Sequence, residues 1–134
     1  MERAITVLTD VNDLEQLLQG ARIEQANLRT VGGRSELSLE LTRAMMERSP
    51  EKRGLFRRSK VPWTKSRLTL RQITATTVIP PTDVPANEMP VVSAQAAVGG
   101  YQVIVKTPEG MQMVLTADQL DGTFADIGAP IESP

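Results

Sequence analysis

Histidine and cysteine are both absent from the 134 residues of this chain, and only four of its side chains are aromatic. Histidine is the commonest general base and metal ligand in proteins, and cysteine is the most reactive nucleophile. A serine nucleophile activated by histidine is excluded as well. Without cysteine there is no disulfide framework, so stability does not depend on an oxidising compartment. We therefore expect a chain that is not an enzyme and that holds no metal or cofactor.

The totals are those of an ordinary folded protein. The apolar fraction is 40% and the charged fraction is 23%. A length near the usual domain size predicts a single domain, 1–134, whose core must be aliphatic because aromatic side chains are so few. The first ten residues do not resemble a signal peptide, and no apolar run approaches the roughly 18 residues of a membrane span. The expected location is the cytoplasm.

One amphipathic helix is predicted near the N-terminus, at Val11–Gln19. Its apolar residues recur at helical spacing and form a single stripe. Asp10 precedes it as a candidate N-cap, and Gly20 follows it, where a helix end favours a residue that can take positive φ. The preceding segment, Arg3–Leu8, is β-branched and forms either a strand or the lead into the helix.

After the helix the apolar residues change to the two-residue period of strands. Ile23–Thr30 and Ser35–Thr42 are predicted to form an antiparallel hairpin around the pair Gly32-Gly33. The second of these strands alternates regularly, which is typical of a strand with one buried face. Its predicted buried residues are Leu37, Leu39 and Leu41.

The middle of the chain contains one further strand between irregular segments. Arg67–Ile79 is this strand, and its apolar face changes from even to odd positions, which predicts a bulge or bend near Arg71. A basic loop precedes it at 47–63, because the segment has no regular period and contains proline and glycine. A proline-rich connector follows at 80–90, and a loose tail is expected at 128–134.

The last third is predicted to be a meander that completes the fold. Ala117–Leu120 is expected to form a single helical turn, and Phe124 and Ile127 to make the last core contacts. The expected strands are Val91–Val98, Tyr101–Thr107 and Met111–Thr116. The sequence therefore predicts a mainly β (α+β) fold, an antiparallel sheet or meander with one N-terminal helix, arranged as a sandwich or a partly closed barrel.

Charge is distributed unevenly along the chain. Residues 43–71 hold ten of the fifteen basic residues and only two of the sixteen acidic ones, so this segment carries +8 and the remainder −9. Basic and aromatic residues are mixed in its central loop, which makes that loop a candidate partner-binding site. The candidate residues are Arg53, Phe56, Arg57, Arg58, Lys60 and Trp63.

Several interpretations of this basic loop remain open. Its arginines can pair with the acidic remainder of the same chain or of a second subunit, or they can bind an acidic protein. Alternatively, residues 52–67 bind nucleic acid phosphates while Phe56 or Trp63 stacks on a base. Attraction to an anionic membrane surface is a further alternative. Asp118, Asp121 and Asp126 lack the spacing of a calcium loop. Asp118 and Asp121 are expected to serve turns and caps, and Lys106 is expected to be an exposed strand lysine.

The order of elements, one amphipathic helix followed by hairpins, a polar loop and a meander, resembles small uncharacterised bacterial domains, some of them immunity-type partners of toxins. This resemblance in architecture implies binding rather than catalysis. We therefore expect a protein-interaction or structural module that forms a homo-oligomer or binds an acidic protein. The alternative function is that of a nucleic-acid-binding accessory protein.

Overall fold

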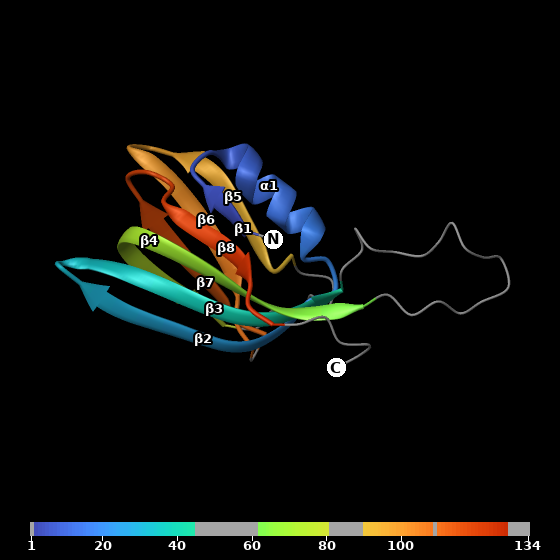
Figure 1. Cartoon of the computed structure of the whole chain (residues 1–134). Coiled ribbons are helices and arrows are strands. Elements are labelled where there is room, and N and C mark those ends of the chain that lie inside the picture. Colours follow the sequence, from blue (N-terminus) through green and yellow to red (C-terminus); the bar gives the residue numbers. More distant parts are fainter. Residues whose placement is uncertain (1, 45–61, 81–89, 109, 129–134) are drawn as a thin grey trace, which may run out of the picture.

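A single curled antiparallel sheet with one helix packed against it makes up the fold in the computed structural model (Figure 1), which describes residues 2–44, 62–80, 90–108 and 110–128. The predicted mainly β fold with one N-terminal helix is confirmed, and the sheet forms a half-barrel. Along the chain the elements are β1 (Glu2–Ile5), α1 (Leu8–Leu17), β2 (Arg22–Val31), β3 (Arg34–Ala44), β4 (Trp63–Ile79), β5 (Val92–Ala97), β6 (Gly100–Lys106), β7 (Gln112–Ala117) and β8 (Gly122–Asp126).

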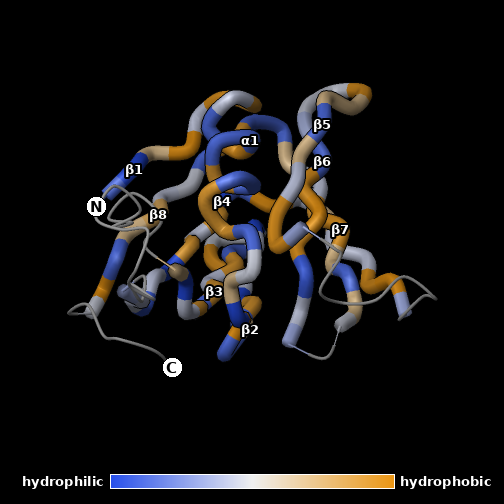
Figure 2. Tube along the Cα trace, turned by 90° about the vertical axis from the view of Figure 1, so that its right-hand side faces the viewer, coloured by the Kyte–Doolittle hydropathy of each residue, from blue (hydrophilic) through white to orange (hydrophobic). Residues whose placement is uncertain are grey.

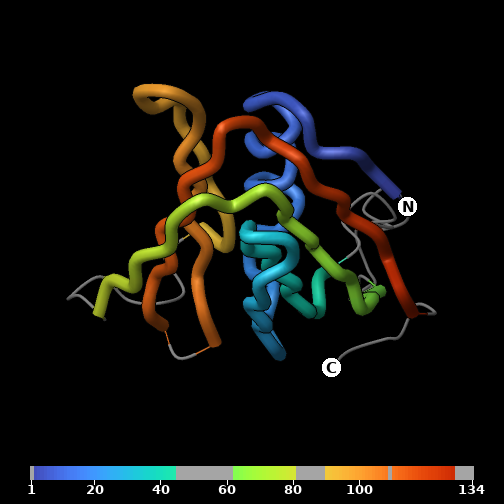
Figure 3. The backbone as a smooth tube through the Cα atoms, turned by 90° about the vertical axis from the view of Figure 1, so that its left-hand side faces the viewer, coloured from blue at the N-terminus to red at the C-terminus, as the bar shows by residue number. Residues whose placement is uncertain are grey.

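Strand β4 is the spine of the sheet because it pairs with three other strands. Along one edge it pairs with β3, and along the other it pairs first with β8 and then with β7. Strands β7 and β8 therefore lie end to end beside β4, and both follow its arch (Figure 3). Strand β2 lies outside β3, β1 lies outside β8, and β6 and then β5 lie outside β7.

The arch has a local cause in the backbone of β4. Gln72 has a φ of +62°, the only positive φ among the described non-glycine residues, and the pairing registers with β3 and β7 shift on either side of Ile73. The backbone N–H of Arg71 donates to the carbonyl of Asp121, 2.7 Å away, where β7 gives way to β8. The bend predicted near Arg71 is confirmed, and a register shift of this kind increases the local twist of a sheet.

Helix α1 begins earlier than predicted, at Leu8 rather than Val11. Asp10 is therefore not the N-cap but lies inside the first turn. Its carboxylate accepts hydrogen bonds from the backbone N–H groups of Thr6 (2.9 Å) and Val7 (3.2 Å). These two hydrogen bonds stabilise the turn that leads into the helix. The helix packs between β1 and β5 (Figure 1) and buries its apolar stripe against the inner face of the sheet.

The inner face of the half-barrel is aliphatic, as predicted. Hydropathy alternates along the strands (Figure 2), and Leu37, Leu39 and Leu41 are buried together. Phe124 is fully buried, whereas Ile127 is 44% exposed, so its predicted core contact is wrong. Ile127 follows Asp126, whose side chain faces inward, and successive side chains of an extended chain point to opposite faces.

Two further boundaries differ from the predictions. Strand β4 begins at Trp63, four residues before the predicted start. Residues 117–120 form no helical turn, because Ala117 ends β7 and the chain then bends toward β8. Most of the predicted basic loop, proline-rich connector and tail lies outside the described residues. No helix in the described part is long and apolar enough to cross a membrane.

Candidate functional site

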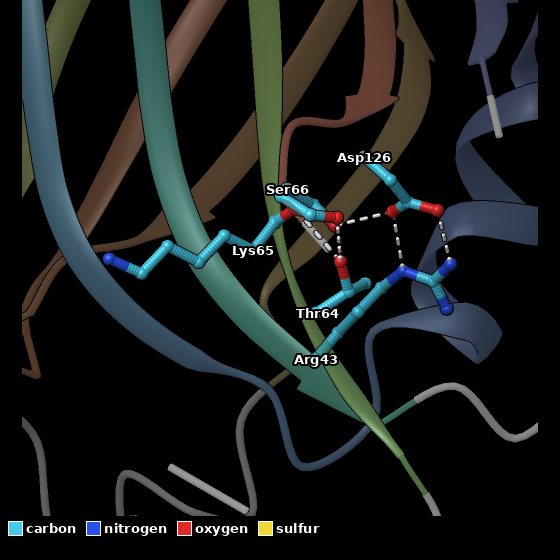
Figure 4. A network of polar contacts seen from close by, with 6 residues as sticks. Arg43, Thr64, Lys65, Ser66 and Asp126 are labelled. Carbon is cyan, nitrogen blue, oxygen red and sulfur yellow. Dashed lines mark hydrogen bonds and ion pairs between the residues drawn. The ribbon is translucent and has the colours of Figure 1, made fainter. Parts of the chain in front are cut away.

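A cluster of polar side chains closes one end of the apolar core (Figure 4). Arg43 on β3 is fully buried, and its guanidinium meets the carboxylate of Asp126 on β8 through two contacts, Nε to Oδ1 at 3.1 Å and Nη2 to Oδ2 at 2.9 Å. The hydroxyl of Ser66 on β4 donates to the same Oδ1 at 2.6 Å. The three strands therefore meet at one bidentate ion pair.

The electrostatics of this cluster hold the carboxylate in its ionised form. Burial raises the pKa of Asp126. Hydrogen bonds from Arg43 and Ser66 and the positive charge of Arg43 together lower it by a larger amount, so the pKa lies below the usual value. The guanidinium of Arg43 also lies 5.8 Å from the centre of the Phe124 ring, within the range of a cation–π contact. No described buried side-chain nitrogen or oxygen lacks a hydrogen-bond partner. We conclude that the cluster holds three strands together.

The three aspartates singled out in the sequence each face a different arginine. Asp118 pairs with Arg34 at 3.0 Å and Asp121 pairs with Arg71 at 3.4 Å, both at the surface, while Asp126 belongs to the buried cluster. Because they are spread over three ion pairs, they do not converge on a shared cation. Within the described ranges no group of three His, Cys, Asp or Glu side chains could hold a metal ion.

Part of the positive segment serves the fold itself. Arg43 is buried against Asp126, Arg67 pairs with Glu40 at 2.7 Å across β3 and β4, and Arg71 pairs with Asp121. These arginines lie outside the predicted loop at 47–63, so the interpretations of that loop stay open. Arg67 lies within the 52–67 segment considered for nucleic acid, and its charge is already paired with a carboxylate.

The predicted partner-binding residues fall almost entirely outside the described residues. This applies to Arg53, Phe56, Arg57, Arg58 and Lys60. Trp63 is the one that the structure places, as the first residue of β4, paired across the strands with Ala44 and half-buried. The proposed grouping of all six residues therefore stays a prediction.

A pocket of about 870 Å³ lies where the end of α1 meets the β5 and β6 strands. Its walls include Glu15, Leu18, Arg22, Val91 and Lys106. Burial lowers the pKa of the Lys106 ammonium, and Lys106 is half-buried rather than exposed as predicted. The walls combine one carboxylate with two cations and aliphatic side chains.

The sheet is open at several edges. Strand β2 has no strand outside it among the described residues, and β4 has none beyond Ile73 on the edge that β3 occupies up to that point. A groove of about 390 Å³ lies between β2 and the second half of β4, with Ala26, Val78, Met111 and Met113 among its walls. Sequence patterns predicted the strands but not this opening, since it depends on how far β3 extends beside β4.

Comparison with known proteins yields no match to any protein-family model, to any curated protein or to any solved structure. The function of the chain is therefore inferred from its residues and their geometry.

Proposed function

We propose that this chain is a non-catalytic protein-interaction or structural module that associates with itself or with an acidic protein. The observation that carries this proposal is the half-barrel left open along strand edges, because unpaired strand edges present rows of backbone N–H and C=O groups to a partner. The composition supports it, since neither histidine nor cysteine occurs in the chain.

The two modes of association predict different responses to salt. Association through the basic loop weakens as salt rises, because exposed charges are screened beyond a Debye length. Association through strand edges depends on backbone hydrogen bonds and apolar contact, so it changes little with salt. Sedimentation velocity over a range of concentrations, at low and at high salt, separates the two.

The second measurement is a pull-down of tagged protein from nuclease-treated cell extract. A protein partner that is lost at high salt, and lost in the double variant Arg57→Ala/Arg58→Ala, supports the acidic-partner mode. Binding that disappears only after nuclease treatment favours the nucleic-acid alternative instead. A protein that is monomeric at every concentration and salt, and that retains no partner, contradicts the proposed function.

A further inference from the structure

The second half of β4, residues 74–79, has one edge that no described strand occupies. Its other edge pairs with β7 in regular register from Ala75 to Ile79. The pairing of β3 with β4 ends where Ser35 lies opposite Ile73. The edge of β4 that faces β3 is therefore open from residue 74 onward among the described residues. In Figure 3 this half of β4 is the yellow-green segment at the left of the picture, and β7 is the orange segment to its right. We call residues 74–79 the open edge.

The composition of the open edge suits pairing with another strand. None of its six residues is charged, and five of them are β-branched, which is the composition that extended strands favour. Edge strands that must stay single usually carry charge, a proline or a bulge, or are short or covered by a helix. The open edge has no charge and no proline before Pro80, and most of its length is regular.

Every other outer strand of the sheet has at least one of these protections. Strand β2 carries three charged residues, Arg22, Glu24 and Arg29, and a register shift between Ile23 and Gln25. Strand β1 has only four residues, two of them charged. Strand β5 is the strand against which α1 packs. The open edge is therefore the position at which the described sheet is most readily extended.

The surface beside the open edge is mostly apolar, although Glu24 and Gln25 of β2 also line the groove there. Val78 is 51% exposed although it lies opposite the buried Met113 and faces the inner side of the sheet. It forms one wall of the groove whose other walls include Ala26 and Met111. A strand added beside β4 would cover Val78 and lie along this groove, so that apolar surface is buried together with the strand pairing.

We propose that the open edge of one molecule pairs antiparallel with the open edge of a second copy, so that the two sheets join into one across a two-fold axis. This inference rests on the proposed function and names its partner and surface. Charge favours a second copy as the occupant, because like charges placed opposite each other destabilise paired strands and this edge has none. A two-fold pairing is also the commonest symmetry of homo-oligomers.

The open edges of the two molecules can pair in two registers that keep side chains of the same face opposite each other. With Thr76 on the axis, Ala75 lies opposite Thr77 and Thr74 opposite Val78 of the other molecule. With Thr77 on the axis, Thr76 lies opposite Val78 and Ala75 opposite Ile79. Both keep inward side chains opposite inward ones, which pairing of strands requires.

The test introduces lysine at two exposed positions on the outer face of the open edge, in the variant Ala75→Lys/Thr77→Lys. In either register this variant places lysines of the two molecules opposite each other. We expect the wild-type chain to sediment as a dimer at low and high salt, and this variant to sediment as a monomer. The variant Ala75→Glu/Thr77→Glu should also be monomeric, and an equimolar mixture of the two variants should form a heterodimer.

The matched control places lysines at exposed outer-face positions of β2 that do not line the groove, in Asn27→Lys/Val31→Lys, which should remain dimeric. A wild-type chain that is monomeric at all concentrations overturns the two-copy pairing. That result leaves the association with an acidic protein to be tested by the pull-down from nuclease-treated extract. A dimer that survives the β4 lysines, or that the β2 lysines abolish, overturns the surface while leaving self-association intact. Backbone hydrogen exchange on the unmodified chain is a second readout: protection of residues 75–79 should rise with concentration, and unchanged exchange contradicts the pairing.

Discussion

Replacement of Asp126 by asparagine tests the role assigned to the buried cluster. The substitution keeps the size of the side chain and one acceptor oxygen but removes the negative charge that lies 2.9 Å from the fully buried guanidinium of Arg43. Removing one partner of a buried ion pair costs about 3–5 kcal/mol. Because the Asp126 side chain keeps 10% exposure and asparagine can still accept a hydrogen bond from Ser66, we expect a loss near the lower end, about 3 kcal/mol.

The matched control is Glu40→Gln, which makes the same change of charge in an ion pair at the surface. Both side chains of the Glu40–Arg67 pair are substantially exposed, so its loss should cost less than about 1 kcal/mol. Urea denaturation followed by circular dichroism and by the fluorescence of Trp63, the single tryptophan, measures both variants. With a denaturant slope of about 1–3 kcal/mol/M, the expected shift of the Asp126→Asn midpoint is about 1–3 M. Equal shifts in the two variants would refute the assignment of Asp126 to a buried, strand-fastening pair.

Three further predictions follow from the described contacts. The pKa of Asp126 is lower in the folded chain than in the unfolded one, so its contribution to stability is full above about pH 4 and is lost as pH falls through the folded pKa; the gap in urea midpoint between wild type and Asp126→Asn should therefore narrow in acid, and a gap independent of pH contradicts this. Gly122→Ala should destabilise the fold by about 1–3 kcal/mol, because the added Cβ would lie 2.5 Å from the carbonyl oxygen of Thr69. The control Gly128→Ala should be tolerated, because its Cβ would lie 3.6 Å from the Lys65 side chain. Equal melting temperatures for the two variants would show that the backbone of β4 moves to make room for the Cβ at residue 122. The pKa of Asp10 is lowered chiefly by the backbone N–H groups of Thr6 and Val7, so Asp10→Ala should lower helical circular dichroism and the urea midpoint more than the exposed control Asp13→Ala, and no difference between them would contradict its capping role.

The sequence predicted most strands because their inner faces are aliphatic at every second position. The hairpin that ends in β3 and the bend in β4 were both visible in this way, since the change from Leu70 to Ile73 marks a change of face. The start of β4 was not predicted because polar residues occupy its inner-face positions. Thr64 and Ser66 are buried on the inner face but are polar, because they donate to Gly128 and Asp126, so hydropathy does not mark them as inward-facing.

The candidate sites were harder to predict because they depend on pairs of residues far apart in the chain. Arg43 reads as part of a basic segment, yet its partner Asp126 is 83 positions away and only the pairing of β4 with β3 and β8 brings them together. The open edge likewise depends on the length of β3, which stops beside Ile73. A sequence pattern shows that residues 74–79 can form a strand, but the register of its neighbour decides which of its edges is left free.

The pairing of β1 with β8 has a consequence for biosynthesis. Residues 2–5 can find their partners only after residues 122–126 have been made, and at about 5–20 residues per second the intervening chain takes on the order of 10 s to leave the ribosome. During that interval the aliphatic stripe of α1 also lacks β5, the strand that it packs against. Pairings between segments far apart in a chain close long loops and slow folding. The synthesis of β8 therefore sets the earliest moment at which β1 can become native.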